Sequence, residues 1–542
     1  MIKKICGNIY DHQFGHFRKG SITFSEKIIS IYFDENVVGD NFILPGLIDS
    51  HVHIESSMMS PVNYANEALR HGVVAAIADP HEIANVCGLS GVEYMVKSAS
   101  LSPMKIFFGA PSCVPATSFE TSGSTLSSNE ISILFKNNTC WHLSEVMNFP
   151  GVIAHEKDVL DKIQIARDFN KIIDGHAPGL QADLLKEYVS FGISTDHECT
   201  SIEESKEKIE LGMKILLRRS SASNDFLNLM DLISSNEDDV MLCTDDCHPD
   251  DLQNGYIDEM IKDALQRDFP LKKLLKAATF NPVFHYNLPV GILNIGSFAD
   301  FIVVDCLENF TVLETYINGK CVYNGNTVIS IDEKILPVNK FFSNKLTLND
   351  LKVLNDKHSL LNVIEIIPNS LLTNKLILPI DVTQQYIFSD IENDILKIVV
   401  LNRYTKDKPS IGFIKGFGIR KGAFGSTVAH DSHNIIVVGT DDFSILSVIN
   451  ALQQSLGGLA FFNGNTINLL PLPIGGLMSN ESCDIVSAQY KSLTDEVRSV
   501  GCTLKSPFMT LAFMSLLVIP KLKIGDRGLF DVDSFSFTEL LM

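Results

Sequence analysis

Short apolar segments alternate with helix-like segments through the middle of this chain, from residue 45 to residue 288. The apolar segments include Val73–Ala78, Lys105–Gly109 and Val240–Asp245, and the helix-like blocks include Glu203–Leu211 and Asp258–Gln266. Short continuous apolar runs separated by helical stretches predict buried parallel strands connected by helices. Repeated β-then-α units over this length predict an α/β protein with a TIM-like (β/α)8 barrel.

The two flanks of this region, residues 1–44 and 289–341, have a different pattern, in which short β-like runs alternate with turns. The second flank contains the pair Asn318-Gly319, which is typical of two-residue hairpin turns. We therefore expect a small composite β-sandwich that is assembled from both flanks of the barrel.

A third region follows the second flank, from residue 342 to residue 542. Residues 342–360 are polar and rich in Lys and Asn, which indicates a linker or a surface helix. Beyond them lie strand-like runs, glycine-rich turns and a helical stretch at Ser444–Gln454. This mixture predicts a separate C-terminal α+β domain over residues 342–542.

Residue types that bind metals end several of the predicted barrel strands. Catalytic groups of such barrels lie at the carboxyl ends of the strands. If Ile48–His53 is a strand, His51 and His53 point to the same face. Four imidazoles and two carboxylates predict two divalent ions that share a hydroxide at neutral pH, as in a hydrolytic metalloenzyme. The predicted ligands are His51, His53, Glu145, His176, His197 and Asp245, with Glu145 as the bridge.

Each predicted ligand also has an ordinary explanation when it is taken alone. His176 by itself is more commonly a structural histidine, and Glu145 by itself is more commonly a solvated carboxylate. Asp245 and Asp246 also suit the cap of a following helix. The ordered placement of all the ligand types at strand ends favours the metal site.

Composition excludes some classes of function. A net charge of -21 argues against binding of nucleic acid or an anionic membrane through bulk electrostatics, although it allows a small nucleobase substrate. The longest apolar run, around Leu511–Ile519, is too short to span a bilayer. The 11 cysteines include no CxxC pair, and the N-terminus lacks the apolar core of a signal peptide, so we expect a reducing, cytoplasmic location.

Several sequence blocks together resemble the bacterial-type adenine deaminases of the amidohydrolase superfamily. They extend over nearly the whole chain, and HVHIESSM and SEVMNFPGV are the most specific of them. Many members of the superfamily have a modified lysine at the position of Glu145, where a glutamate resembles the adenine deaminase pattern. The blocks are Pro45–Met58, Ala78–Val86, Ser144–Val152, Asp174–Leu180, Ser194–Cys199, Cys243–Asp246, Val428–Asn434, Leu470–Ser479 and Gly525–Val532.

The resemblance implies a reaction and a cofactor. The reaction is hydrolysis of adenine to hypoxanthine and ammonia by a metal-bridging hydroxide, in purine salvage. The cofactor is a binuclear centre of Mn2+ or Fe2+. We expect adenine as the small-molecule substrate, no nucleic-acid or membrane partner, and a homo-oligomer that is a dimer or larger.

The resemblance also implies roles for single residues. We expect Asp245 to accept a proton from the nucleophile and to pass it to the leaving amine, with Asp246 as the alternative. Glu55 or Glu82 is expected to protonate N1 of the purine, although both also suit the capping of a helix N-terminus. The residues expected to shape the purine pocket are Ser56, Asp79, His81 and Asn85.

Two positions depart from the family pattern. Tyr404 stands where we expect a histidine after Arg403, and Cys247 stands where we expect a basic residue. In addition, His430 and His433 form an H-x-x-H pair around Asp431, which suits either a metal site or a hydrogen-bonded turn. We expect this cluster to close the pocket or to join subunits.

Two alternatives from other classes remain. A cyclic-amide hydrolase, similar to dihydroorotase or hydantoinase, shares the barrel and the H-x-H motif but normally has a lysine at the position of Glu145. A barrel retained as a non-catalytic binding protein would lack some of the metal ligands. Release of ammonia from adenine separates the first alternative from the deaminase.

Overall fold

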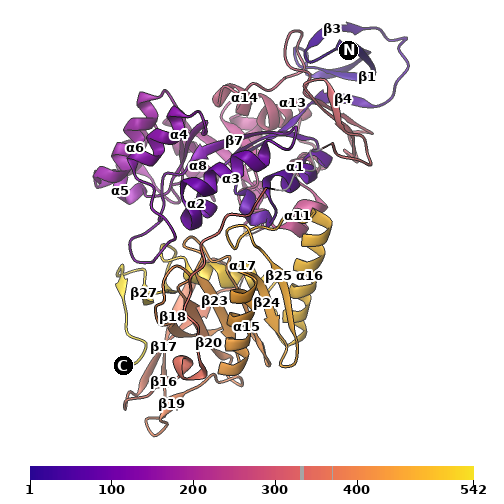
Figure 1. The fold of residues 1–542 in the computed structure, drawn as a ribbon. Coiled ribbons are helices and arrows are strands. Elements are labelled where there is room, and N and C mark those ends of the chain that lie inside the picture. The colour runs from indigo at the N-terminus through magenta and orange to yellow at the C-terminus, as the bar shows by residue number, and fades with distance from the viewer. Residues whose placement is uncertain (222, 330–334, 369) are drawn as a thin grey trace. The chain divides into compact units, whose positions relative to one another are not determined.

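The computed structural model describes residues 1–221, 223–329, 335–368 and 370–542 (Figure 1). The chain divides into two compact units. The first unit contains Met1–His81, Glu93–Cys113 and Ser127–Ile335. The second unit contains Glu82–Val92, Val114–Leu126 and Leu336–Met542. Two segments of the predicted barrel region therefore belong to the second unit, while the three-domain division stays a prediction.

Eight parallel strands of the first unit curl into a barrel, which confirms the predicted (β/α)8 fold. Strands β5 to β9 pair in chain order, and so do β10 to β12. Bridges between Ile173 and Ile193 and between Val52 and Asp245 join the two sets at both seams. The strands are β5 (Leu47–Val52), β6 (Val73–Ala78), β7 (Lys105–Ala110), β8 (His142–Val146), β9 (Ile173–Gly175), β10 (Thr195–Asp196), β11 (Lys214–Arg218) and β12 (Val240–Cys243).

Local sequence signals explain where several helices of the barrel region begin. Ser127 and Glu130 form a reciprocal capping box at α4, which satisfies backbone N–H groups of its first turn. Pro61 occupies the first turn of α1, where a missing N–H costs nothing. The helices are η1 (Ile54–Ser57), α1 (Pro61–Arg70), α2 (His81–Cys87), α3 (Leu89–Ala99), α4 (Ser128–Lys136), α5 (Phe149–Ile153), α6 (Lys157–Asp168), α7 (Ala182–Ser190), α8 (Ile202–Glu210), α9 (Phe226–Leu229), α10 (Asp231–Ser235), α11 (Pro249–Asn254), α12 (Ile257–Leu265), α13 (Leu271–Leu275), η2 (Lys276–Phe280) and α14 (Asn281–His285).

The Lys208 side chain, on α8, is fully buried inside the first unit. Its ammonium group forms an ion pair with Asp196 and lies 2.7 Å from Glu204 Oε1. It also donates to the carbonyl of Ala177 at 2.8 Å. The charge of Lys208 therefore compensates the carboxylates of Asp196, in β10, and Glu204, in α8.

Replacing Lys208 with methionine should lower the free energy of unfolding by about 3–5 kcal/mol, because Asp196 would remain buried without its cation. Urea unfolding of the wild type and the variant measures the difference. The control is Lys186→Met, which removes an exposed pair with Asp183 and should leave the free energy of unfolding nearly unchanged. Equal losses in the two variants would contradict the prediction.

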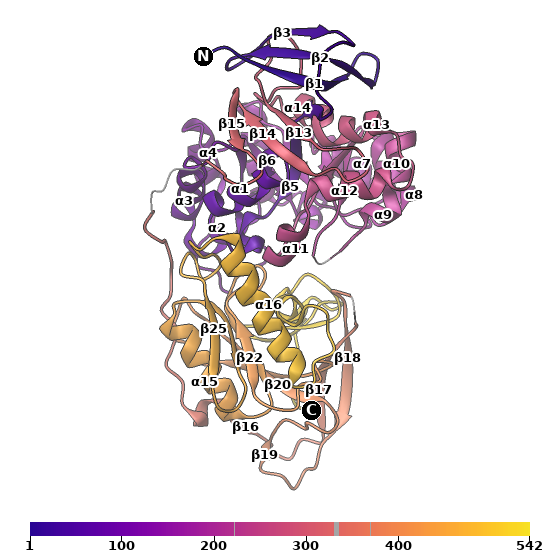
Figure 2. The ribbon, with the colours of Figure 1, turned by 90° about the vertical axis from the view of Figure 1, so that its right-hand side faces the viewer.

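The two flanks, for which we predict a composite β-sandwich, contribute strands that pair in one seven-stranded sheet (Figure 2). Strands β4 and β13 join the two flanks. Asn318 and Gly319 have φ values of 48° and 70°, as a type I′ turn requires, so the hairpin prediction is confirmed. The strands are β1 (Lys3–Asp11), β2 (His16–Phe24), β3 (Ile28–Phe33), β4 (Phe42–Pro45), β13 (Phe301–Val304), β14 (Val312–Ile317) and β15 (Lys320–Tyr323).

An eight-stranded sheet, in the order β18-β17-β21-β20-β23-β22-β24-β25, is the centre of the second unit. Helix α15 packs on one face, where Ala423 belongs to its apolar core. The next residue, Phe424, points to the other face and contacts Phe508 of α17, with ring centroids 5.2 Å apart. The main strands are β17 (Leu360–Ile366), β18 (Thr373–Pro379), β20 (Ile395–Leu401), β21 (Ser410–Lys415), β22 (Ala423–Ser426), β23 (Ile435–Gly439), β24 (Gly458–Phe462) and β25 (Ile467–Pro471).

The second unit also contains helices and several short strands outside the eight-stranded sheet. In the predicted linker, residues 342–360, the structure has one 3-10 turn, η3, and the short strand β16 rather than a surface helix. The helices and short strands are η3 (Leu348–Leu351), α15 (Asp442–Gln454), α16 (Cys483–Ser499), α17 (Pro507–Ala512), η4 (Phe513–Ser515), β16 (Val353–Leu354), β19 (Tyr386–Ile387), β26 (Leu522–Gly525), β27 (Gly528–Asp531) and β28 (Ser536–Phe537).

Lys523, on β26, is a second fully buried lysine. Its ammonium group donates to the carbonyls of Leu371 at 2.9 Å and Phe513 at 3.0 Å. Burial lowers the pKa of Lys523 to about 7. The folded protein therefore binds this proton more weakly than the unfolded chain, in which a lysine has a pKa of about 10.4.

The free energy of unfolding should consequently rise with pH between about 7 and 10, since the unfolded state binds more protons there. The contribution of Lys523 has a slope of at most about 1.4 kcal/mol per pH unit. Lys523→Met should remove this contribution and flatten the profile, whereas substitution of the exposed Lys521 should leave it unchanged. Urea unfolding midpoints at several pH values measure this pH dependence. Parallel profiles for the wild type and Lys523→Met would refute the contribution of Lys523.

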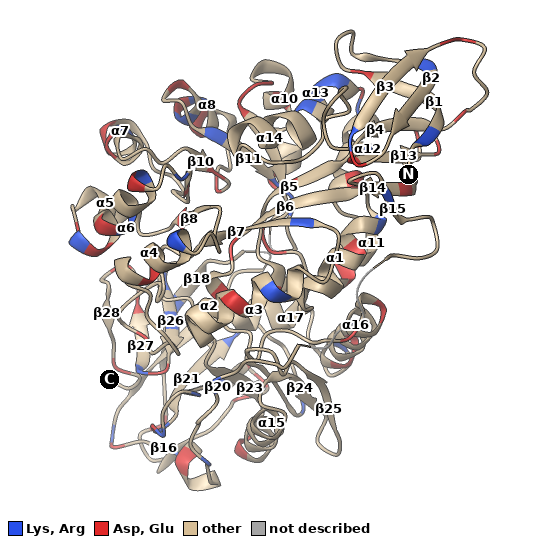
Figure 3. Ribbon diagram, turned by 45° about the horizontal axis from the view of Figure 1, so that its top comes forward, with Lys and Arg blue, Asp and Glu red and all other residues tan. Residues whose placement is uncertain are grey.

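Two observations bear on the predicted absence of membrane and nucleic-acid partners. Within the described ranges, no helix has both the length and the apolar character needed to cross a bilayer. Figure 3 shows acidic and basic residues interspersed along helices such as α6 and α8.

Candidate metal centre

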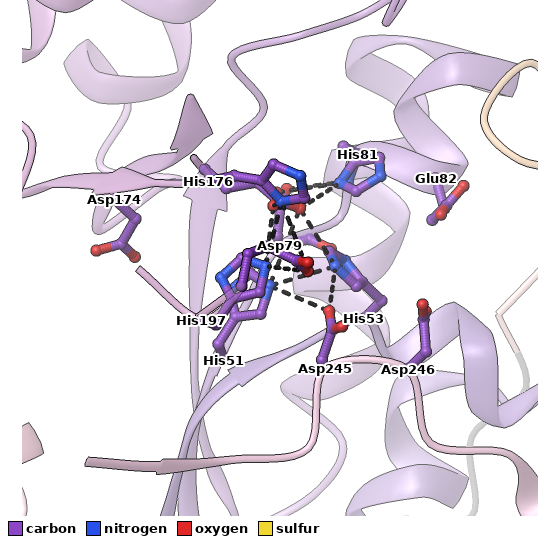
Figure 4. Close-up of polar contacts among 12 residues, drawn as sticks. His51, His53, Asp79, His81, Glu82, Asp174, His176, His197, Asp245 and Asp246 are labelled. Carbon is purple, nitrogen blue, oxygen red and sulfur yellow. Dashed lines mark hydrogen bonds and ion pairs between the residues drawn. The ribbon is translucent and has the colours of Figure 1, made fainter. Parts of the chain in front are cut away.

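The structure brings together the side chains of all six predicted ligands within the first unit. Figure 4 labels His51, His53, His176, His197 and Asp245 among them. They come from the carboxyl ends of β5, β8, β9, β10 and β12 or from the residues directly after them. Five of the six residues are buried, and His176 is partly exposed. The six are His51, His53, Glu145, His176, His197 and Asp245.

Glu145 lies at the centre of the cluster, and its two oxygens face different histidines. Oε1 is 3.3 Å from Nε2 of His53. Oε2 is 2.8 Å from Nδ1 of His176 and 3.2 Å from Nε2 of His197. Burial alone would raise the pKa of Glu145, but His176 and His197 outweigh it and hold that pKa well below its usual range. An ionised carboxylate with one oxygen on each side suits a bridge between two cations.

His53 directs its Nε2 into the cluster. Its Nδ1 lies 3.2 Å from the backbone oxygen of Asp79, which can only accept a hydrogen bond. Nδ1 of His53 therefore carries a proton, and Nε2 faces Nε2 of His51 at 3.3 Å. Burial, together with the neighbouring His197, lowers the pKa of His51 to about 4, so that this imidazole is neutral near pH 7. These two imidazoles and the neighbouring carboxylates form a donor set that fits divalent cations.

Asp49 connects strand β5, which carries His51, to the segment after β12, which carries Asp245. Its carboxylate accepts hydrogen bonds from Thr244 Oγ1 and from Tyr256 Oη, both at 2.5 Å. It also accepts from the backbone N–H groups of His51 and Thr244, both at 3.2 Å. One buried side chain thus connects β5 to the segment after β12 and holds Asp245 beside His51.

Asp245 is constrained through its backbone and through both of its carboxylate oxygens. Its N–H donates to the carbonyl of His51, its carbonyl accepts from the N–H of His53, and its φ of 57° lies in the left-handed region. Oδ1 is 3.1 Å from Nε2 of His53, and Oδ2 accepts from Nη1 of Arg218 at 3.1 Å. Burial alone would raise the pKa of Asp245, but the His51, His53 and Arg218 interactions hold it well below its usual range.

The other predicted residues of the first unit lie around this cluster. Asp79 Oδ2 is 3.1 Å from Nδ1 of His81, and the same nitrogen is 3.5 Å from Glu145 Oε1. Ser56 donates its hydroxyl proton to Asp246 Oδ1 at 2.5 Å. Asp246 therefore accepts a hydrogen bond from Ser56, whereas Asp245 is the aspartate that faces the imidazoles.

Glu55 is buried on η1, directly after β5 and His53. Glu82 and Asn85 lie on α2 and belong to the second unit. Glu82 contacts His430 and His433 there, so the predicted H-x-x-H cluster has a glutamate as its partner.

Two residues that were not predicted from the sequence contact the predicted ligands. Arg218 binds Asp245 and also pairs with Glu198, whose Oε1 is 3.6 Å from Nε2 of His197. Arg218 is the last residue of β11, so the strand-end rule would have found it if cations had been searched as well as ligand types. Glu198 directly follows His197 in the sequence.

Comparisons with known proteins give two family matches. Residues 42–322 match the family described as "Amidohydrolase family", and residues 370–536 match the family described as "Adenine deaminase C-terminal domain". The first of these families implies a divalent metal, which the donor set of the cluster fits.

Curated relatives match over almost their whole lengths. The chain is 46% identical over 552 aligned positions to the adenine deaminase of Methanosarcina mazei, covering 99% of each chain. It is 47% identical over 513 positions to the adenine deaminase of Borreliella burgdorferi, covering 93% of each chain. Among solved structures, a β-aspartyl dipeptidase of Fervidobacterium islandicum AW-1 superposes with a TM-score of 0.46 at 18% identity, covering 62% of this chain and 100% of that one.

Proposed function

The chain belongs to the adenine deaminase family of amidohydrolases, and from that membership we propose that it hydrolyses adenine to hypoxanthine and ammonia. One observation carries the proposal beyond the family match. Glu145, and not a lysine, lies among four histidines and Asp245 at the barrel strand ends. This arrangement disfavours the cyclic-amide hydrolases, which normally have a lysine there.

The six clustered side chains would hold two divalent cations, and Glu145 would bridge them. Imidazole and carboxylate ligands without a thiolate suit Mn2+ and Fe2+. When bound, such a pair of cations supplies a hydroxide nucleophile at neutral pH.

Asp245 is the proton carrier in this proposal. Because Arg218 occupies Oδ2, Oδ1 is the oxygen that accepts the proton released as water adds to C6 of adenine. Asp245 then delivers that proton to the leaving amine. Arg218 keeps the carboxylate oriented during both transfers.

Glu55 is the better candidate for protonation of N1. It lies on η1 next to His53 within the first unit, whereas the Glu82 carboxylate accepts hydrogen bonds from two imidazoles, which favours its ionised form. Asp79 and His81 adjoin the ligands and are proposed to contact the purine, while Ser56 acts by holding Asp246. Asn85, on α2, stays a predicted pocket residue.

Formation of hypoxanthine from adenine by the manganese-loaded protein tests the proposal, with adenosine as the control substrate. We expect ammonia and hypoxanthine in equal amounts, loss of activity after chelation, and recovery when manganese is added back. Ring opening of a dihydroorotate or hydantoin without any ammonia from adenine would favour the cyclic-amide hydrolase instead. Failure to turn over any of these substrates with metal bound would favour the binding protein.

The cellular setting is also a proposal. A product that is itself a purine base supports a role in purine salvage, and the 11 cysteines, all free thiols, support a reducing cytoplasmic location. That the chain forms a homo-oligomer stays a prediction. Sedimentation of the purified protein measures its oligomeric state.

A further inference from the structure

Asp225 is a buried carboxylate that is not one of the six metal ligands. It is only 7% exposed and directly precedes helix α9. An aspartate at this position usually caps the helix, because its side chain accepts a backbone N–H of the first turn. Here the side chain makes no such bond, and the backbone carbonyl of Asp225 accepts the N–H groups of Asn228 and Leu229 instead. The carboxylate is therefore directed toward another group.

That group is the guanidinium of Arg218, at the end of β11. Nη2 of Arg218 donates to Asp225 Oδ2 at 3.0 Å, and the hydroxyl of Ser223 donates to the same oxygen at 2.6 Å. Ser223 belongs to a turn, in which the N–H of Ser220 donates to the Ser223 carbonyl at 2.7 Å and Ser220 Oγ accepts the N–H of Ser223 at 2.9 Å. The turn between β11 and α9 thus holds the carboxylate against the arginine.

The other terminal nitrogen of Arg218, Nη1, is shared by two carboxylates next to the metal-ligand histidines. It donates to Asp245 Oδ2 at 3.1 Å and makes a short ion pair with Glu198 Oε1. The same oxygen of Glu198 lies 3.6 Å from Nε2 of His197. One guanidinium group therefore connects Asp225 to the metal-ligand cluster, entirely within the first unit.

The third nitrogen, Nε of Arg218, is buried and has no hydrogen-bond partner within the described part of the chain. A guanidinium group is planar, and its N–H donors have fixed directions. The contacts of Nη1 and Nη2 therefore set the direction of the plane, and Asp225 holds Nη2. Without Asp225 the group could turn, and Nη1 would move away from Oδ2 of Asp245.

We propose that Asp225 is a positioning residue for deamination, which acts through Arg218 on the Asp245 carboxylate. It keeps Oδ2 of Asp245 on the arginine, so that Oδ1 stays 3.1 Å from Nε2 of His53. This role rests on the proposed function, because Asp245 is the proton carrier there. Asp225 touches neither the substrate nor a metal ligand in this proposal, so its loss should impair proton transfer and not substrate binding.

Two substitutions of Asp225 test the proposal. Leucine removes the acceptor for Nη2, whereas asparagine keeps an oxygen without the charge. We expect Asp225→Leu to lower kcat for adenine by about 100-fold and Asp225→Asn by about tenfold. KM should stay within about twofold of the wild type, and metal content should be unchanged. The solvent deuterium isotope effect on kcat should rise in both variants, because a misplaced carboxylate makes proton transfer limit the rate more strongly.

A neighbouring ion pair supplies the matched control. Arg219 directly follows Arg218, and its Nη1 lies 2.8 Å from Asp263 Oδ2, with the two side chains 33% and 32% exposed. Asp263→Leu and Asp263→Asn remove the same kind of partner from the next arginine. Each should change kcat by less than about twofold and leave the isotope effect unchanged.

A double-mutant cycle shows whether Asp225 acts through Arg218. Arg218→Lys keeps the positive charge, but one ammonium nitrogen cannot replace the two that contact Asp225 and Asp245. In this background Asp225→Leu should lower kcat by less than about threefold further. Losses that multiply in the double variant would overturn the proposal.

Wild-type kcat in Asp225→Leu would also overturn the proposal, and so would a loss of kcat without any rise in the isotope effect. If the leucine variant does not fold, Asp225→Asn decides, alone and combined with Arg218→Lys. Wild-type kcat in Asp225→Asn, or an undiminished loss in the combined variant, would then overturn the role. A wild-type protein that forms no hypoxanthine would refute the proposed function itself, and this role with it.

Discussion

Asp245→Asn should lower kcat for adenine by about 10³- to 10⁴-fold while most of the bound metal remains. Asparagine keeps an oxygen for the contacts around residue 245, but it cannot accept and return a proton at Oδ1. Oδ1 is the oxygen directed at the imidazoles, since Oδ2 accepts from Arg218. The measurements are kcat from the rate of hypoxanthine formation and metal content by elemental analysis.

Asp246→Asn is the matched control for this experiment. The neighbouring aspartate accepts the hydroxyl proton of Ser56 at 2.5 Å and lies outside the ligand cluster. We expect a loss of less than about tenfold, because an amide oxygen can still accept from Ser56. If Asp245→Asn keeps most of its kcat, or if Asp246→Asn loses more, the assignment of the proton carrier is wrong.

Glu145→Gln should remove at least one bound cation per chain and lower kcat/KM by about 10³-fold, equivalent to about 4 kcal/mol of transition-state stabilisation. The amide has one neutral oxygen and one NH2 group, so one side of the bridge would present hydrogen atoms to the cation. The side affected is either the one facing His53 or the one facing His176 and His197. Metal analysis after gel filtration, with hypoxanthine formation on the same sample, measures both effects.

Glu187→Gln is the control for the bridge. Its carboxylate is on α7, where it is 37% exposed and pairs with His155. This variant should bind metal and turn over adenine like the wild type. Full metal content together with wild-type turnover in Glu145→Gln would show that the glutamate is not a ligand.

The barrel and its ligand positions could be predicted from the sequence because both depend on local patterns. Buried parallel strands are continuous apolar runs, so Val73–Ala78 is recognised as a strand, and the structure has β6 at these residues. The ends of such strands meet at one edge of a barrel, which brings His51, Glu145 and His197 together from distant parts of the sequence. Arg218 ends β11 by the same rule and was missed only because cations were not considered.

Side-chain pairing could not be predicted in this way. Asp245 and Asp246 are adjacent in sequence, and only their backbone conformations direct one toward the imidazoles and the other toward Ser56. Nothing in the local pattern links Glu82 to His430, since these residues are 348 positions apart.

The sequence by itself determined the fold class and the set of metal-binding residue types, since both follow from hydrophobic periodicity and strand ends. Only the tertiary structure decided which backbone group faces a ring nitrogen of His53 and of His433. A backbone carbonyl faces Nδ1 of His53, and a backbone N–H faces Nδ1 of His433. The same type of side chain therefore has different partners in the two places, because long-range packing supplies them.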